Sequence, residues 1–169
     1  MAITTAAVGI DLGSYNARVA TFDESLNQPV CAHNHDGNRA TRVLHGDDNR
    51  AVTDTASLKT FLEEKLVPLA SSAAHTKDLH IVASVPSGCE SDDDKISKEW
   101  MEELRQRGGV ITEAAAICLA YGLEESAQEN QKFLVVDAGA SGVKAPLMKY
   151  VQGGLWSTQW TKMQKDVTG

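Results

Sequence analysis

The chain has 169 residues, enough for one domain with a substantial apolar core. A formal net charge of −7 argues against a broad nucleic-acid footprint, and no apolar run approaches the roughly 20 residues that a membrane-spanning helix needs. The three cysteines, Cys31, Cys89 and Cys118, show no metal or redox spacing. We therefore expect an acidic cytoplasmic protein in reducing surroundings, with no nucleic acid or membrane as partner.

The chain opens on a predicted β-hairpin. Val8–Leu12 reads as a buried strand, Gly13–Tyr15 as a glycine turn, and Ala17–Phe22 as the returning strand. Backbone N–H groups that converge in such a turn can bind an anion, and Asp11 can hold a hydrated divalent cation against that anion. A plain hairpin with a solvated Asp11 is the alternative interpretation, because short glycine motifs also occur by chance.

Three strands in succession are expected at the start of the domain, since Pro29–Ala32 can return beside the hairpin. The polar, turn-rich stretch His33–Arg39 predicts a loop. Its two histidines, His33 and His35, are two residues apart and could point at a metal, but no cluster of cysteines or carboxylates gives them plausible partners. We therefore expect a solvated loop rather than a metal site.

The next elements alternate between helix and strand. Asp54 can cap a helix with an apolar stripe, and Pro68 is expected to kink or shorten its last turn. Pro86 ends a predicted strand at Leu79–Val85. The stripe of the helix consists of Leu58, Phe61, Leu62, Leu66 and Leu69.

A second helix is predicted from a capping box formed by Ser91 and Asp94 to the glycine pair Gly108-Gly109. The run Asp92–Asp94 suits a solvated first turn that compensates the helix dipole better than it suits a metal cluster, because consecutive helical residues point in different directions. A short strand at Val110-Ile111 then leads into an alanine-rich helix over 113–122.

The pattern of the opening hairpin recurs near the end of the chain. Lys132–Asp137 reads as a strand that ends in an acid, and Ala138–Gly142 as a glycine turn; a hairpin over 143–151 and 154–161 follows. If the two hairpins are neighbours, Asp11 and Asp137 repel one another, and a shared cation with a polyphosphate relieves that repulsion. The pair predicts a phosphate site.

These motifs resemble those of the heat-shock protein 70 (DnaK-like) chaperones. Val8–Asn16 is similar to the first phosphate motif of that family and Val135–Gly142 to the second. Three further stretches match in the same order: the Gly-Asn-Arg loop at Gly37–Thr41, the strand Leu79–Pro86, and the helix from Thr112 to Leu123 with its Ala-Tyr-Gly ending.

The resemblance implies an α/β fold of the ribonuclease-H-like kind, a mixed five-stranded sheet with flanking helices, as in the actin and heat-shock-70 ATPase superfamily. Residues 1–169 would form a single domain, lobe I, within a longer protein. The implied ligands are ATP or ADP with Mg. The implied partners are the second lobe and the peptide-binding domain of the same chain, and a J-domain co-chaperone or the ribosome.

The resemblance also implies site residues. Asp11 and Asp137 would hold Mg through water, and Asp137 and Glu113 are the candidates for a catalytic role. The residues expected to contact the nucleotide are Asp11, Gly13, Ser14, Tyr15, Asp137, Gly139, Ala140 and Ser141.

Several departures from the family pattern bear on catalysis. The small inserted subdomain of the family is expected to be missing, and Ser57 aligns with its catalytic lysine; Lys59 is not assigned that role. In the second phosphate motif, Gly142 replaces a threonine and Lys144 replaces an acid. Because loss of one group that stabilises charge commonly costs about 100- to 1,000-fold in rate, we expect weak or absent hydrolysis.

The sequence leaves three functions open. The first is an atypical chaperone or co-chaperone domain that binds ATP with little hydrolysis. The second is an ordinary ATP-dependent chaperone, and the third an interaction scaffold that binds no nucleotide. Coupling to a substrate domain is in doubt, because Asp94 and Ala114 stand where the family has an arginine and a proline.

Overall fold

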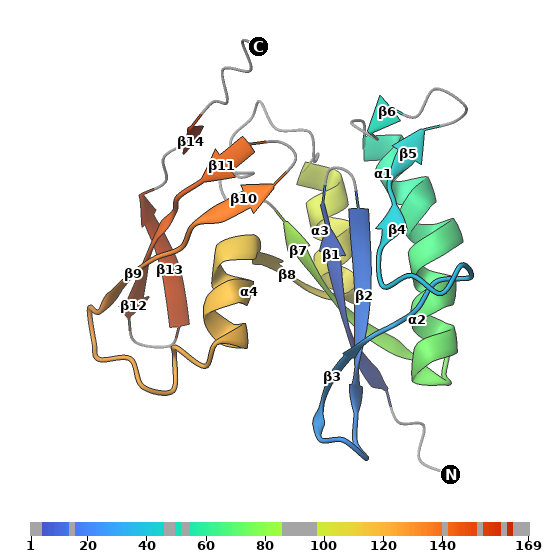
Figure 1. The fold of residues 1–169 in the computed structure, drawn as a ribbon, viewed down its shortest axis with the longest axis horizontal. Helices are drawn as coiled ribbons and strands as arrows, with labels where there is room; N and C mark the ends of the chain where they lie inside the picture. Colours follow the sequence, from blue (N-terminus) through green and yellow to red (C-terminus); the bar gives the residue numbers. More distant parts are fainter. Residues whose placement is uncertain are drawn as a thin grey trace. The chain divides into compact units, whose positions relative to one another are not determined.

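The structure is a computed structural model that describes residues 5–13, 16–45, 50–51, 55–85, 98–139, 142–151, 154–159 and 162–163 (Figure 1). The chain divides into two compact units. Unit 1 comprises Met1–Val85 with Asp92–Val110, and unit 2 comprises Pro86–Ser91 with Ile111–Gly169.

A mixed β-sheet forms the centre of unit 1. β1 (Ala6–Leu12) runs antiparallel to β2 (Asn16–Asp23) and parallel to β7 (Leu79–Val85), and β2 runs antiparallel to β3 (Gln28–Cys31). The strand order is β3-β2-β1-β7-β8, with β4 pairing beside β2. The remaining bounds are β4 (Thr41–Arg42), β8 (Gly108–Thr112) and, in a separate two-stranded ribbon, β5 (Leu44–His45) and β6 (Arg50–Ala51). The prediction of an α/β fold with a mixed sheet is confirmed.

Alternating burial explains why the opening strands were predictable. In β1, Val8, Ile10 and Leu12 are buried, and the residues between them are more exposed. β2 and β7 follow the same period of two, which places one side of each strand against the core. All four strands expected in this part of the chain are present, although β1 begins at Ala6 rather than at Val8.

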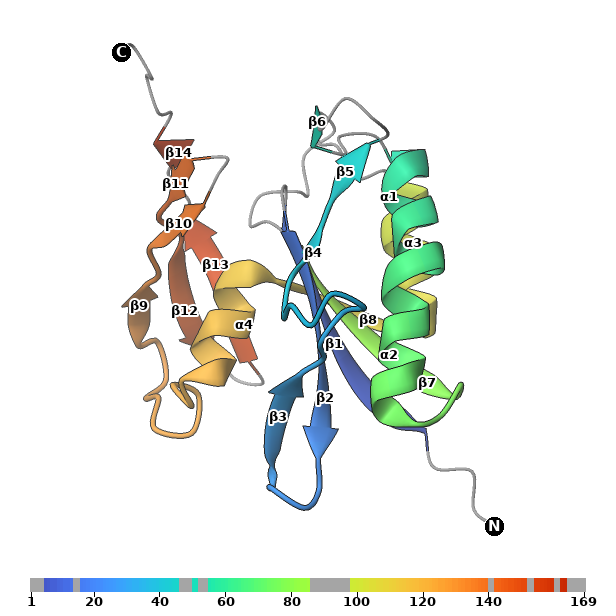
Figure 2. The same cartoon turned by 45° about the vertical axis from the view of Figure 1, so that its right-hand side comes forward.

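One long helix covers the sheet of unit 1, and its winding changes along its length (Figure 2). It consists of α1 (Thr55–Phe61), the π-helical segment η2 (Leu62–Leu66) and α2 (Val67–Ala74), and the backbone is helical at both junctions. Pro68 does not shorten the helix as predicted. Because Pro68 has no N–H to donate to the preceding turn, the winding widens just before it, and the helix then continues to Ala74. The predicted cap, Asp54, lies outside the described residues.

A second helix, α3 (Lys98–Arg107), packs in unit 1 with Met101 and Leu104 buried. Ion pairs link it to the long helix: Lys59 Nζ lies 2.8 Å from Glu103 Oε2, and Arg107 pairs with Glu63. The chain passes directly from α3 into β8, and the predicted helix end before the glycine pair is confirmed. The predicted capping box at Ser91 and Asp94, and the run Asp92–Asp94, lie outside the described residues.

The described residues of unit 2 form one helix and two small sheets. α4 (Glu113–Ala120) begins where the Thr112 side chain accepts a hydrogen bond from the backbone N–H of Ala115, and it is followed by Gly122 at φ +62°. One sheet has the order β13-β12-β9 and the other β10-β11-β14. Their strands are β9 (Lys132–Leu134), β10 (Asp137–Gly139), β11 (Gly142–Lys144), β12 (Leu147–Val151), β13 (Gly154–Gln159) and β14 (Lys162–Met163).

The prediction of one strand from Lys132 to Asp137 is wrong. β9 ends at Leu134 and pairs with β12, whereas Asp137 is the first residue of β10, which pairs with β11. Between them, Val135 is buried and donates its N–H to Pro146 O at 3.0 Å. The apolar run therefore serves two sheets in succession, and Asp137 begins a strand instead of ending one.

Candidate functional site

The carboxylate of Asp11 has a protein partner on each oxygen. Asp11 lies opposite Arg18 in the ladder of β1 and β2, and opposite Ser84 in that of β1 and β7. Arg18 Nη1 lies 3.2 Å from Asp11 Oδ2, and Ser84 Oγ donates to Asp11 Oδ1 at 3.2 Å. The Asp11 side chain is 40% exposed. Asp11 is thus held by neighbours on both adjacent strands and is not simply solvated.

The guanidinium group changes what this carboxylate can bind. A cation approaching Asp11 meets the positive charge of Arg18, and its attraction to the carboxylate is reduced accordingly. An anion is instead attracted by Arg18, which provides hydrogen-bond donors beside the hairpin. The ion pair therefore weakens the attraction of Asp11 for a metal ion.

Gly13 is required by the backbone of the hairpin turn. A Cβ atom at this position would lie 2.6 Å from the carbonyl oxygen of Asn16, closer than real contacts allow. This close approach accounts for the glycine in either interpretation of the turn, as a plain hairpin or as an anion cradle. Ser14 and Tyr15, the other predicted contacts, lie outside the described residues.

The second hairpin is formed by β10 and β11. Asp137 lies opposite Lys144 in their antiparallel ladder, and Gly139 lies opposite Gly142. Within the part of the chain that the structure describes, the Asp137 side chain makes no hydrogen bond or ion pair. Ala140 and Ser141, predicted as nucleotide contacts, lie outside that part.

An ion pair joins this hairpin to α4. Lys144 Nζ lies 3.0 Å from Glu113 Oε2, and the two side chains are only 20% and 17% exposed. Glu113 is the first residue of α4, where the helix dipole also favours a negative charge. One of the two catalytic candidates is therefore engaged by Lys144.

The two predicted metal-binding acids belong to different units. Asp11 is in unit 1 and Asp137 is in unit 2. A joint site between them stays a prediction. Among the described residues, no group of three or more His, Cys, Asp or Glu side chains is arranged to hold a metal ion.

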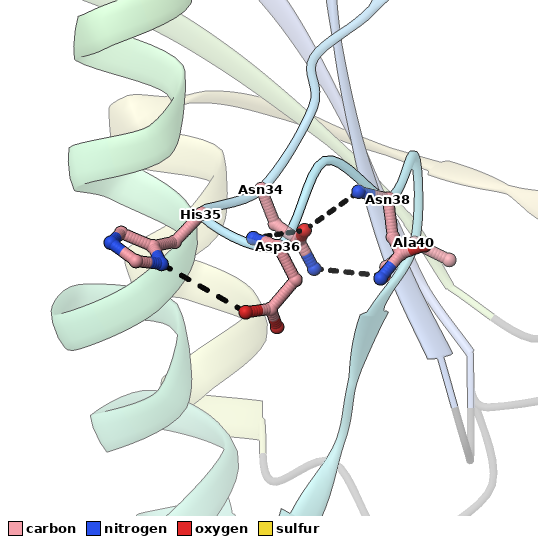
Figure 3. A network of polar contacts seen from close by, with 5 residues as sticks. All are labelled: Asn34, His35, Asp36, Asn38 and Ala40. Carbon is pink, nitrogen blue, oxygen red and sulfur yellow. Dashed lines mark hydrogen bonds and ion pairs between the residues drawn. The ribbon is translucent and has the colours of Figure 1, made fainter.

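The predicted loop at His33–Arg39 is organised by a side chain that sequence reasoning did not single out (Figure 3). Asn34 Oδ1 accepts hydrogen bonds from the N–H groups of Asp36, at 3.0 Å, and Asn38, at 2.9 Å. Its Nδ2 donates to Ala40 O at 3.1 Å. His35 is fully exposed, with Nδ1 3.8 Å from Asp36 Oδ1. The loop that resembles the family's Gly-Asn-Arg motif is thus closed by its own hydrogen bonds.

Lys59, to which no catalytic role is assigned, has a structural partner. It donates to Glu103 on α3 at 2.8 Å, and this hydrogen bond lowers the pKa of Glu103. Its ammonium group is accordingly engaged within unit 1.

Part of this arrangement was detectable in the sequence. A tight hairpin between Val8–Leu12 and Ala17–Phe22 places Asp11 opposite Arg18, so that their pairing follows from the register. The contacts of Ser84 with Asp11 and of Lys144 with Glu113 depend on long-range folding and had no local signal in the sequence.

In the segments that the structure describes, no helix has the length and hydropathy needed to cross a bilayer. Comparison with family models and with curated proteins found no match for this chain.

Proposed function

We propose that this chain is the nucleotide lobe of an atypical heat-shock-70-like chaperone or co-chaperone, which binds ATP weakly and hydrolyses it slowly or not at all. Its ribonuclease-H-like lobe would contribute the two phosphate hairpins. Support comes from the order of the motifs along the chain and from the mixed sheet that carries the first hairpin. The free thiols of Cys31 and Cys118 suit a cytoplasmic location.

The pair of Lys144 with Glu113 is the observation that carries the proposal. A metal-dependent hydrolase needs carboxylates that are free to orient water and cation, but here a lysine stands opposite Asp137 and binds Glu113. Arg18 has the same effect on Asp11 in the first hairpin. Asp11 and Asp137 keep a role in positioning phosphate through neighbouring donors. The transfer of a phosphoryl group to water, however, loses the groups that would stabilise its developing charge.

The test is a titration of the full-length protein with MgATP, followed by melting temperature and by single-turnover hydrolysis. We expect a small, saturable rise in melting temperature and no hydrolysis above background. The Asp137→Asn variant should alter the rise, and Asp36→Asn, an exposed loop variant, serves as its control. No rise at millimolar nucleotide would favour the scaffold, and turnover at the rate of ordinary chaperones would favour an active ATPase.

A further inference from the structure

The sheet of β13, β12 and β9 in unit 2 has an open edge along β9. β9 is the last strand in this order, and both views of the fold show it on the outer side of β12 (Figures 1 and 2). Val135, which directly follows β9, donates its N–H to the carbonyl oxygen of Pro146, directly before β12, at 3.0 Å. Because successive residues of an antiparallel strand direct their backbone groups to opposite sides, those of Leu134 and Val136 point away from β12. Among the described residues, no further strand pairs with this edge.

Apolar side chains line the same edge. Successive side chains of a strand point to opposite faces of the sheet. Phe133 and Val135 pack in the apolar core of unit 2, together with Cys118 of α4. Leu134 and Val136 lie on the other face and are 66% and 63% exposed. An edge that offers both apolar side chains and unused backbone N–H and C=O groups is a template for pairing with another extended chain.

Two lysines stand beside this apolar pair. Lys132 in β9 lies directly opposite Lys149 in β12, and it shares a face with Leu134, two residues further along the strand. Like charges directly opposite one another destabilise a sheet. Neither ammonium group has an acidic partner among the described residues, so the repulsion between them is not offset there. A negative charge placed beside Lys132 would offset it.

These charges decide between the possible occupants of the edge. A second copy that paired through its own β9 would bring another pair of lysines to a face that already holds Lys132 and Lys149. A lysine on an edge strand is also a device by which natural proteins prevent such self-pairing. An extended segment that carries an acid on this face is attracted instead, because the acid offsets the repulsion between the two lysines.

We propose that β9 is a docking site for an extended segment of a partner protein, in which one acidic and two apolar side chains share a face. The segment adds a strand to the sheet by pairing with the backbone groups of Leu134 and Val136. Its acidic side chain lies beside Lys132, and its apolar side chains pack on Leu134 and Val136. This pairing does not require a bound nucleotide.

The experiment uses the whole chain and a labelled peptide in which threonine alternates with glutamate, leucine and valine, so that one face of the extended peptide carries the acid and the apolar side chains. Binding is measured by fluorescence anisotropy. Hydrogen exchange of individual backbone amides, followed by NMR, reports the pairing, and sedimentation velocity reports self-association. A second peptide, with lysine in place of glutamate, tests the charge.

Two variants change the charge and the apolar contact. They are Lys132→Glu and Leu134→Thr, both at exposed positions. The control is Lys77→Glu, an exposed lysine of unit 1 with the same change of charge. Each of the two variants should weaken binding of the glutamate peptide by about threefold or more, and Lys77→Glu by much less. Lys132→Glu should also strengthen binding of the lysine peptide, which loss of structure would not do.

In the free protein, we expect the amide of Val135 to exchange slowly, because it is hydrogen bonded, and those of Leu134 and Val136 to exchange fast. The glutamate peptide should slow both fast amides about tenfold when its concentration is about ten times its Kd. The proposal is overturned if this peptide fails to bind at millimolar concentration, if the lysine peptide binds the unchanged chain as tightly, or if the bound peptide leaves the two amides unprotected. It is also overturned if both amides are protected in the free protein: a dimer in sedimentation would then assign the edge to a second copy, and a monomer would show that the chain itself covers it.

Discussion

Lys144 stands opposite Asp137 across β10 and β11, and its Nζ lies 3.0 Å from Glu113 Oε2 at the start of α4. Lys144 therefore lies opposite one acid in the ladder of its own hairpin and pairs with another acid on the helix. Because Lys144 and Glu113 are both mostly buried, this pair ties the hairpin to the helix more firmly than a surface ion pair would.

Replacing Lys144 with methionine should destabilise unit 2 by about 1–3 kcal/mol, because a mostly buried carboxylate loses its cationic partner. Lys132→Met, at an exposed position of β9, is the matched control and should cost less than about 0.5 kcal/mol. Urea denaturation followed by far-UV circular dichroism measures both. Equal stability of the two variants would show that the ion pair contributes nothing net.

Gly108→Ala should be strongly destabilising, whereas Gly109→Ala should be tolerated. A Cβ atom on Gly108 would lie 2.4 Å from the carbonyl oxygen of Ile81, in the backbone of β7, which cannot move aside as a side chain can. The nearest atom to a Cβ on Gly109 is a Val82 methyl carbon at 3.9 Å, an ordinary contact. In thermal unfolding, the free energy of unfolding of Gly108→Ala should be lower than that of Gly109→Ala by about 1–3 kcal/mol or more. Similar melting temperatures would contradict the close approach of β7 and β8.

The carboxyl group of Asp23 should titrate below its ordinary range. The hydrogen bond from the Ser25 side chain is the main cause, followed by the N–H of Leu26, and both favour the ionised form and lower the pKa of Asp23. The stability that this ionised form contributes is present above about pH 4 and is lost as the pH falls through the lowered value. Carbon-detected NMR titration should show a higher midpoint for Asp23 in Ser25→Ala, and an unchanged midpoint would refute the assignment.

Cys118 should resist alkylation in the folded protein. It is fully buried in the core of unit 2, and burial raises the pKa of its thiol, so little reactive thiolate forms at neutral pH. Its modification by iodoacetamide should follow the opening of unit 2 and accelerate in Lys144→Met, as read by mass spectrometry of the peptides. Rapid modification of Cys118 in the native protein would show that its face of α4 is not buried in the core of unit 2.

The opening hairpin, its third strand and β7 could be predicted because alternating burial leaves a period of two in the sequence. The division between β9 and β10 could not, because Leu134 and Val136 continue the apolar run while being 66% and 63% exposed. What separates the two strands is the hydrogen bond from Val135 to Pro146, a contact that depends on the returning chain.

The site was predictable to a similar degree. The strands of the first hairpin were predicted, and the position of Asp11 opposite Arg18 follows from the register. In the second hairpin, Ala138, Gly139 and Gly142 are strand residues where the sequence predicts a turn. The charges of the second hairpin could be predicted only in part from the sequence. Lys144 stands where an acid is expected, but its partner Glu113 is 31 residues away in the chain. Pairing at that separation depends on how α4 packs.

The buried residues of the long helix recur at every fourth position: Leu58, Leu62, Leu66 and Ala70. In a regular α-helix of about 3.6 residues per turn, each step of four drifts by about 40°, and three steps would carry Ala70 about 120° from Leu58. The wider winding of Leu62–Leu66 reverses this drift and keeps all four on the sheet side. The π-helical segment is therefore a phase correction that accommodates one extra residue. Deleting one residue within it would leave Leu58 and Ala70 eleven positions apart, only about 20° out of line in a regular α-helix, so Leu58 should stay on the sheet side.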